Sequence, residues 1–362
     1  MSTWAVASSE VDILRIPREE PIRSSYASYD AFEVVVVRLT TSGGAVGTGF
    51  TNVIGTGADS IRSFCSSEYL PLVEGREPNE VRAVWDTMFR QGMSRGRKGI
   101  AMYALSAVDI ALWDLLAQQA GLPLHHLLGG SRTRIPAYGN GCWLSFSLER
   151  LVEEATNYVE LGCFGVKVKI GADISQDIER VGAVREAIGS GTQLMIDANQ
   201  RYDPLTALDV ARRLEPFEIT WFEEPVLADS VHDQARVAES SVIPVAAGEN
   251  EYSRYGFREL IEHRAAHILQ PDVHRVGGVT EFMRIAALAE AWNLPLVPHT
   301  SYELHAQLVS AVPHALGVEY HDWFPPGMFS HDFTIVDGHV DLPDTPGLAT
   351  VFDAGAVREY RV

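Results

Sequence analysis

Residues 193–197 (Gln-Leu-Met-Ile-Asp) and residues 219–223 (Ile-Thr-Trp-Phe-Glu) decide how this chain is expected to fold. Each is a short apolar run that ends in a carboxylate, and residues 204–214 between them carry a helical pattern. Strands that alternate with helices in this way are typical of parallel β/α units. The same pattern recurs on both sides of these two segments.

From residue 135 onward, strand patterns alternate with helical patterns. The expected strands are residues 135–139, 165–170, 193–197, 219–223, 243–247, 267–270, 294–298 and 317–320. Helical patterns fit between them, for example at residues 148–161, 175–188, 204–214 and 278–292. Eight such units predict a (β/α)₈-type barrel over residues 131–321, and a doubly wound open sheet is the alternative.

The rest of the chain has a different composition. Residues 32–39 are β-branched and turn at Gly43-Gly44 toward residues 47–51, which indicates an antiparallel hairpin. Residues 101–120 form an apolar helical pattern that should end at Gly121. We therefore expect an α+β domain over residues 1–130, and a β-rich segment, residues 322–362, that folds back onto it.

The bulk composition excludes several classes of partner. With 48 acidic and 29 basic residues the formal net charge is −19, so neither nucleic acid nor an anionic membrane is an expected partner. Three cysteines without CxxC spacing argue against a disulfide framework and favour the cytoplasm. No signal peptide and no run of 18 uninterrupted apolar residues is visible, so we expect no membrane span.

Ionisable residues follow the strand period. In a barrel the C-terminal strand ends meet at one mouth, where the chemistry of such folds takes place. The residues at these ends recur at intervals of 20 to 28 residues and are Lys169, Asp197, Glu223, Glu249, Asp272, His299 and Glu319. This register predicts that their side chains converge at a single site.

Three carboxylates on adjacent strands would repel one another in such a mouth. Asp197, Glu223 and Glu249 are therefore expected to hold a divalent cation, and oxygen-only ligands favour Mg²⁺ over zinc. The alternative is that each carboxylate pairs with a nearby lysine or arginine.

Two lysines and a histidine are the candidates for proton transfer. Lys167 and Lys169 lie one residue apart, so both point to one face of their strand, and we expect each ammonium and a nearby cation to lower their pKa. Asp272 would orient His299 and raise the basicity of its other nitrogen. Glu319, a buried acid among acids, is expected to be protonated and to donate a hydrogen bond to a substrate carboxylate.

Weaker candidates lie near these residues. Asn199 follows the first carboxylate and is expected to touch substrate. Trp143 lies just beyond a strand end, where lining the pocket and packing in the core are both open.

Taken together, these residues resemble the mandelate racemase subgroup of the mandelate racemase/muconate lactonizing enzyme family in the enolase superfamily. The resemblance rests on Lys167-Val-Lys169, Asp197-Ala-Asn199, Trp221-Phe-Glu223-Glu224-Pro225, Gly248-Glu249-Asn250, Gln270-Pro-Asp272 and His299, with residues 104–114 in the N-terminal helix. It covers essentially the whole chain.

The resemblance implies a (β/α)₇β TIM-like barrel with an N-terminal α+β capping domain. It also implies one Mg²⁺ per subunit, which Mn²⁺ can replace, an ene-diolate intermediate and a homo-oligomer. By matching positions, Asp197, Glu223 and Glu249 would be the metal ligands. Lys169 and His299 would be the acid/base pair, with Lys167 and Glu319 at the substrate carboxylate. A capping loop within residues 18–29, which includes Tyr26, would cover the pocket.

That loop is polar, which favours a hydroxylated substrate over an aromatic one. The first hypothesis is dehydration of an acid sugar, an aldonate or aldarate, to a 2-keto-3-deoxy acid. The alternatives are a cycloisomerase of a sugar-acid lactone or anhydro-sugar acid and a 2-hydroxyacid racemase or epimerase. A non-catalytic sugar-acid binding protein is a fourth possibility from another class.

Overall fold

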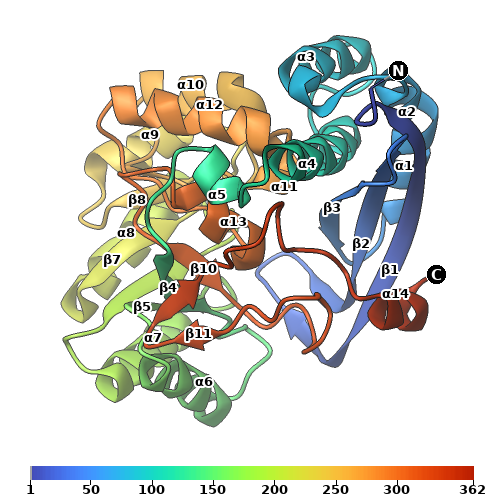
Figure 1. Ribbon diagram of the computed structural model, residues 1–362. Coiled ribbons are helices and arrows are strands. Elements are labelled where there is room, and N and C mark those ends of the chain that lie inside the picture. Colours follow the sequence, from blue (N-terminus) through green and yellow to red (C-terminus); the bar gives the residue numbers. More distant parts are fainter. Residues whose placement is uncertain (1) are drawn as a thin grey trace.

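The computed structural model describes residues 2–362 and contains an antiparallel sheet with its helices beside a β/α barrel (Figure 1). The sheet consists of β1 (Val6–Arg23), β2 (Ser28–Thr41) and β3 (Val46–Ile54), joined in that order. Its β2–β3 hairpin confirms the prediction for residues 32–51, whereas β1 was not anticipated. The helices that follow are α1 (Ala58–Phe64), α2 (Leu70–Val73), α3 (Val81–Gly92), α4 (Ile100–Ala120) and α5 (Leu124–Leu127), with a π-helical turn at Cys65–Tyr69 and a 3₁₀ turn at Pro78–Glu80.

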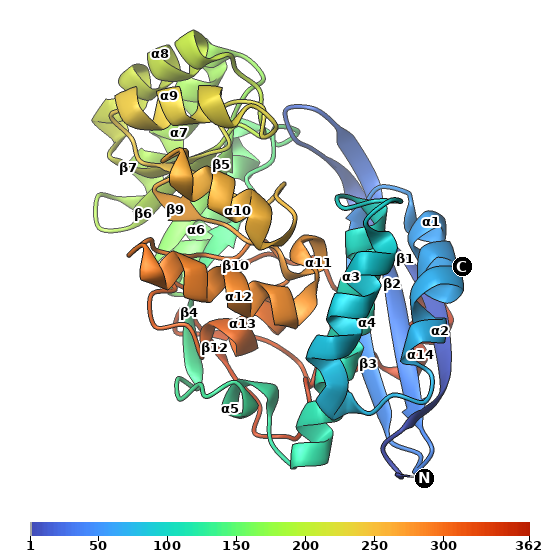
Figure 2. The ribbon, with the colours of Figure 1, turned by 90° about the horizontal axis from the view of Figure 1, so that it is seen from above.

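Helix α4 lies between the sheet and helices of the barrel, as Figure 2 shows from above. Strand β3 approaches it so closely that a Cβ added at Gly49 would lie 2.1 Å from a carbonyl oxygen of α4. The helix ends where expected, because Gly121 adopts a left-handed conformation with φ 67°. It is long and apolar enough to span a membrane, but 78% of its most apolar window is buried inside the fold, which is typical of a core helix.

The barrel strands are parallel and follow one another in sequence order. They are β4 (Arg134–Asn140), β5 (Gly165–Lys169), β6 (Gln193–Asp197), β7 (Ile219–Glu223), β8 (Val245–Ala247), β9 (Ile268–Leu269) and β10 (Val318–Tyr320), and β10 pairs with β4. The helices are α6 (Leu148–Glu160), α7 (Ile174–Ile188), α8 (Pro204–Leu214), α9 (Val231–Ser240), α10 (Ser253–Glu262), α11 (Val273–Val276), α12 (Gly278–Ala291) and α13 (Tyr302–Val309), with a 3₁₀ turn at Glu215–Phe217. The α/β class and the barrel architecture are confirmed.

The seventh expected strand, residues 294–298, is reduced to single bridges. Leu296 pairs with Leu269 on one side and with Ala315 on the other, so the ring continues through it from β9 to β10. Pro295 and Pro298 have no N–H to donate to a ladder, which explains why a regular strand does not form.

A compact layer of side chains fills the barrel interior. Its members come from successive strands and are Tyr138, Met195, Trp221, Ala246, Ile268 and Val297. The barrel interior is therefore a packed core and not an open channel.

The C-terminal segment is mostly irregular, so its expected β-rich character is wrong. It contains two short strands, β11 (Ile335–Val336) and β12 (His339–Asp341), and helix α14 (Ala354–Tyr360). Its several proline and glycine residues interrupt longer pairing. Strand β12 pairs with β4 of the barrel, and α14 packs on β1. The domain boundaries at residues 130 and 321 stay a prediction.

Candidate active site

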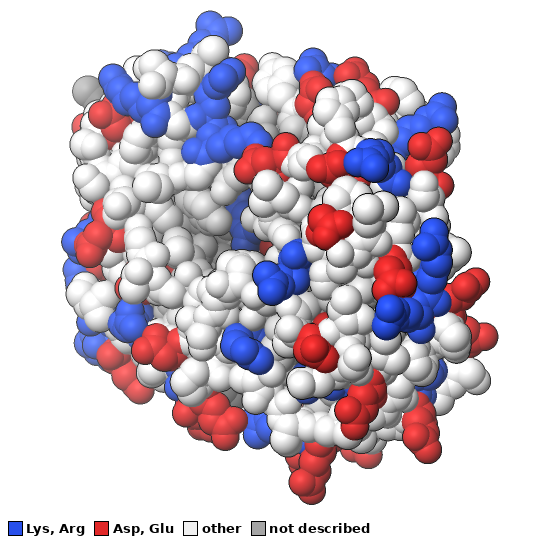
Figure 3. Space-filling view, turned by 180° about the vertical axis from the view of Figure 1, so that it is seen from behind, with Lys and Arg blue, Asp and Glu red and all other residues white. Residues whose placement is uncertain are grey.

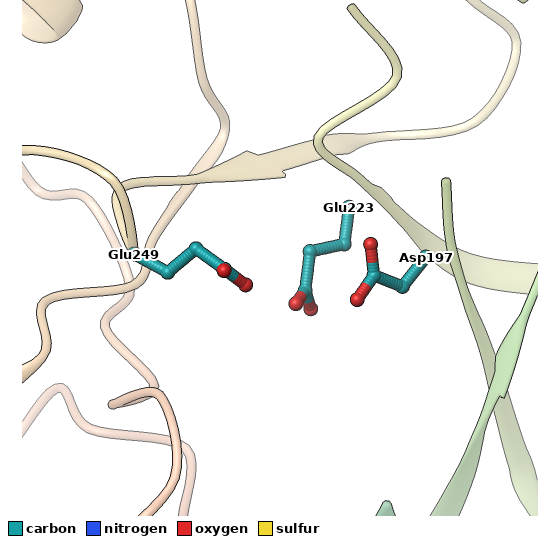
Figure 4. Close-up of side chains that lie close together, drawn as sticks. All are labelled: Asp197, Glu223 and Glu249. Carbon is teal, nitrogen blue, oxygen red and sulfur yellow. The ribbon is translucent and has the colours of Figure 1, made fainter. Parts of the chain in front are cut away.

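Three carboxylates converge at the barrel mouth (Figure 4). Asp197 ends β6, Glu223 ends β7, and Glu249 lies two residues beyond β8. One carboxylate oxygen from each lies within 4.8 Å of the others. Gly248 has φ +138°, and a Cβ there would lie 2.7 Å from the Phe257 ring, so the turn that presents Glu249 requires glycine.

The two lysines of β5 lie among these carboxylates. Lys167 Nζ is 2.6 Å from Glu223 Oε1 and 2.6 Å from Glu319 Oε1, and Lys169 pairs with Asp197. Burial alone would lower the pKa of both lysines, but the neighbouring carboxylates outweigh it and raise the pKa of each. Without a cation, the acids act as counter-ions to the ammonium groups, and the mutual effect of the two lysines alone does not lower their pKa.

The charges at the mouth are unequal. The acids are Asp197, Glu223, Glu249, Asp272 and Glu319, and the cations are Lys167, Lys169 and Arg275. A sixth acid, Glu224, is buried beside them, and burial and then Glu249 raise its pKa well above the usual range. The first five acids outnumber the three cations, so the mouth carries an excess of negative charge that a divalent cation would offset.

The donor set also fits Mg²⁺. All three converging groups offer carboxylate oxygens, the ligand type that this ion prefers. Glu249 Oε2 is buried and accepts no hydrogen bond from residues 2–362. Three protein ligands leave coordination positions for substrate oxygens and water.

His299 and Asp272 form the expected pair. His299 Nδ1 lies 2.9 Å from Asp272 Oδ2, while Asp272 Oδ1 accepts the His274 N–H and caps α11. Burial would lower the pKa of His299, but Glu249 and Asp272 outweigh it and raise it. The imidazole Nε2 lies 3.3 Å from Glu249 Oε2. Glu249, Glu223 and Asp197 lie side by side and are called the acid row here (Figure 4). His299 contacts the Glu249 end of this row, and Lys169 contacts the Asp197 end.

Glu319 is ionised, contrary to the expectation that it is protonated. Burial would raise its pKa, but the Lys167 ammonium outweighs burial and holds the pKa well below the usual range. Glu319 Oε2 accepts the backbone N–H of Thr300 at 2.6 Å. Without a proton this carboxylate accepts hydrogen bonds and cannot donate one.

The weaker candidates lie at different depths. Asn199 is buried and donates its backbone and side-chain N–H groups to Asp197. Trp143 lies beneath Lys169, whose Nζ is 5.3 Å from the ring centroid. Tyr26, at the tip of the β1–β2 hairpin, is 61% exposed and lines the outer wall of the cavity.

Sequence reasoning missed several residues of the site. Gln270 donates to Glu223 Oε2 at 2.6 Å, and Arg275 Nη1 lies 3.3 Å from Glu249 Oε1. Gln270 lies two residues before Asp272, a spacing that places both on one face of an extended segment and gives a usable signal. Trp323 belongs to the irregular C-terminal segment, where no pattern points to the site.

A cavity of about 190 Å³ opens above His299 and Thr300, with Trp323, Arg275 and Tyr26 among its walls. A larger cavity of about 1040 Å³ lies between α3 and α10, but none of the ionisable strand-end residues lines it. The smaller cavity has His299 and the Glu249 partner Arg275 in its wall, which places it at the candidate site. On the face in Figure 3, acidic and basic side chains are interspersed around a central hollow in which a basic group is visible.

Two family models match this chain. "Mandelate racemase / muconate lactonizing enzyme, N-terminal domain" matches residues 8–129, and "Enolase C-terminal domain-like" matches residues 150–356. The chain is 36% identical over 342 residues to an arabinonate dehydratase of Saccharolobus solfataricus, with 91% of each protein covered. It is 34% identical over 346 residues to a 3,6-anhydro-alpha-L-galactonate cycloisomerase of Streptomyces coelicolor, with 94% and 95% covered.

The fold is also similar to that of a liganded crystal structure. L-talarate dehydratase from Polaromonas sp. JS666, complexed with Mg and L-glucarate, superposes with a TM-score of 0.92 at 34% identity. The match covers 99% of this chain and 97% of that one.

Proposed function

This chain belongs to the mandelate racemase/muconate lactonizing enzyme family of the enolase superfamily, and from this premise we propose that it is an Mg²⁺-dependent acid-sugar dehydratase. Its reaction removes the proton beside the carboxylate of an aldonate or aldarate and expels the β-hydroxyl, which yields a 2-keto-3-deoxy acid. Asp197, Glu223 and Glu249 are the proposed metal ligands.

One observation carries this proposal: two proton-transfer groups bracket the acid row. Lys169 pairs with Asp197 at one end, and His299 lies 3.3 Å from Glu249 at the other. A carboxylate bound between them would present its α-carbon to an amine on one side and an imidazole on the other. Binding alone does not require this arrangement, which argues against a non-catalytic binding protein.

Bound Mg²⁺ would polarise the substrate carboxylate and stabilise the negative charge that develops there when the proton leaves. Lys167, fixed by Glu223 and Glu319, adds a second positive charge at the same carboxylate. Because its depressed pKa favours the ionised form, we propose that Glu319 positions Lys167 and the Thr300 backbone and does not donate a hydrogen bond to the substrate.

Lys169 then takes the α-proton, and His299, held by Asp272, donates a proton to the departing hydroxyl. The Asn199 side chain donates a hydrogen bond to Asp197 and helps to fix the position of that carboxylate. We also propose that Asn199 contacts a substrate oxygen. The Lys169 ammonium packs over the face of the Trp143 ring, which helps to hold it in place. Tyr26 lines the cavity and is proposed to cover the barrel mouth.

Cycloisomerisation is the second candidate, and one specific observation favours it. The Streptomyces coelicolor relative, with 94% of this chain covered, is a cycloisomerase of an anhydro-sugar acid. If this chain were a cycloisomerase, a ring ether would take the place of the hydroxyl as the leaving group. A 2-hydroxyacid racemase would use the same two groups without any leaving group, and no observation favours it.

A panel of acid sugars with Mg²⁺ tests the proposal, with keto-acid formation and α-proton exchange in deuterated water as readouts. We expect keto acid from at least one aldonate or aldarate. Lys169→Ala and His299→Asn should abolish turnover, while the control Lys98→Ala, an exposed lysine, should behave as the parent. Exchange without keto acid would support racemisation, and the absence of both would refute the proposed function.

The proposal also includes the compartment, the ligand class and the oligomeric state of the protein. Three buried free cysteines, Cys65, Cys142 and Cys163, suit a reducing cytoplasm. A small carboxylate is the proposed ligand, in line with the glucarate bound by the Polaromonas protein. We also propose a homo-oligomer, which light scattering on the purified protein measures directly.

A further inference from the structure

Two aromatic residues, His321 and Trp323, follow Glu319 and take no part in the proposed chemistry; Trp323 lines the cavity at the barrel mouth, and His321 packs against it. Glu319, His321 and Trp323 lie at alternate positions along an extended segment at the end of β10, so their side chains point to the same side. The His321 and Trp323 rings meet edge to face, with centroids 4.9 Å apart. Both side chains are buried.

Their polar atoms are unusual for buried groups. Neither ring nitrogen of His321 has a hydrogen-bond partner within residues 2–362, and the same holds for Trp323 Nε1. Buried polar atoms normally find partners, since leaving one unpaired is unfavourable. Three such atoms in one ring pair beside the cavity make these two rings candidates for hydrogen bonding to an external group.

This ring pair is adjacent to the reacting groups. Trp323 lines the cavity together with His299 and Thr300, and its ring lies 6.1 Å from that of Trp143, which supports Lys169. A substrate whose carboxylate lies at Lys167 would extend its remaining carbons past these rings.

The charges nearby favour neutral oxygens. Burial lowers the pKa of His321 well below its usual range, so the ring is neutral and offers one donor and one acceptor. The Arg18 guanidinium, 5.9 Å from the Trp323 centroid, already donates to the Asp322 carbonyl at 2.9 Å and lies 3.5 Å from its carboxylate. The subsite therefore matches hydroxyl groups, which both donate and accept.

We propose that His321 and Trp323 form a hydrogen-bonding subsite for the hydroxyl groups of the acid-sugar chain beyond its reacting carbons. This inference rests on the proposed function and makes it more specific. It predicts that chain hydroxyls contribute to binding in addition to the carboxylate and its two neighbouring carbons.

Binding to a turnover-blocked protein tests the subsite. In a Lys169→Ala background with Mg²⁺, calorimetry compares D-galactonate and D-arabinonate with glycerate, which keeps the reacting atoms and lacks the longer chain. Adding His321→Phe or Trp323→Phe should weaken binding of at least one acid sugar by about fivefold to tenfold, the range for a lost neutral hydrogen bond. Glycerate affinity should stay the same.

His314→Phe is the matched control. His314 is a partly buried histidine that precedes β10 and so lies at the other end of the barrel. This control should leave all three affinities unchanged. The melting temperature of His321→Phe should equal or exceed that of its parent, because unpartnered polar atoms are removed.

Two negative outcomes are distinguishable. If neither acid sugar binds the parent more tightly than glycerate, the protein does not recognise the chain hydroxyls and the subsite is refuted. The proposed function is then decided separately, by keto-acid formation from the panel of acid sugars. If the acid sugars bind tightly and both phenylalanine variants bind them equally well, the subsite is refuted while the proposed function stands.

Discussion

Replacing Lys167 by methionine removes the one ammonium that two buried carboxylates share. Its Nζ lies 2.6 Å from both Glu223 Oε1 and Glu319 Oε1. Methionine keeps a similar length without the charge. Glu319 would retain only the Thr300 backbone N–H as a donor at 2.6 Å, whereas Glu223 would keep Gln270.

The size of the effect follows from this geometry. At an effective dielectric of about 20, each contact at this distance has a gross attraction of about 6 kcal/mol, which desolvation largely offsets. Removing one partner of a buried ion pair typically destabilises a protein by about 3–5 kcal/mol, and we expect a loss in this range for Lys167→Met without Mg²⁺.

The loss should depend on pH, and its sign can be worked out. In the parent the pKa of Glu319 is depressed, so this group contributes stability above its unfolded value of 4.5, which is lost as the pH falls toward the depressed value. Without Lys167, burial loses the largest charge that opposes it, and the pKa of Glu319 rises. The variant should therefore be destabilised more at pH 8 than at pH 5.

Urea unfolding of the metal-free proteins at both pH values measures this difference. Lys167→Met/Glu319→Gln is the decisive control, because a neutral amide needs no counter-ion and the double variant should recover most of the lost stability. Activity should stay lost in both variants. A loss below about 1 kcal/mol, or one of equal size at both pH values, would refute the reasoning.

Three further predictions follow from the same site and from α13. Asp272→Asn should lower the pKa of His299 and move the alkaline limb of the kcat profile down by about one pH unit, and an unmoved limb would exclude His299 as the acid. Glu249→Gln should weaken Mg²⁺ binding about 100-fold, so that the Mg²⁺-induced gain in unfolding free energy falls from about 2.7 to about 0.4 kcal/mol at a concentration 100 times the parent Kd. Glu303 is buried in α13, and burial raises its pKa from 4.5 to about 8, so its contribution to stability declines as the pH rises through that window. Glu303→Gln should remove about 2 kcal/mol of the stability difference between pH 5.5 and pH 7.5, measured by urea unfolding.

The alternation of strands and helices was readable because buried parallel strands are short apolar runs bounded by helical patterns. The prediction failed where the apolar pattern of a segment does not match the way its backbone pairs with neighbouring strands. Residues 294–298 are apolar enough for a strand, but Pro295 and Pro298 cannot donate to a ladder. Strand β1 pairs antiparallel with β2. It was missed because its many polar residues interrupt the apolar pattern by which a strand is recognised in the sequence.

At the site, the convergence of the three carboxylates was predictable, and the pKa shifts of the groups around them were not. Asp197, Glu223 and Glu249 were expected at one point because parallel strand ends share an edge, and their oxygens do converge. The states of Lys169 and Glu319 depend on which counter-ion lies within a few ångströms. That information exists only after the chain has folded, because each ion pair joins distant parts of the sequence.

The lysine pairing has a consequence for how the site works. Lys169 needs a free amine to accept a proton, yet the Asp197 carboxylate beside it raises its pKa and favours the ammonium. A cation held by Asp197, Glu223 and Glu249 would share the charge of those carboxylates and add its own positive charge, and both effects lower the pKa of Lys169. The same acids would therefore serve as counter-ions without the metal and as ligands with it, so metal binding would itself activate the proposed base.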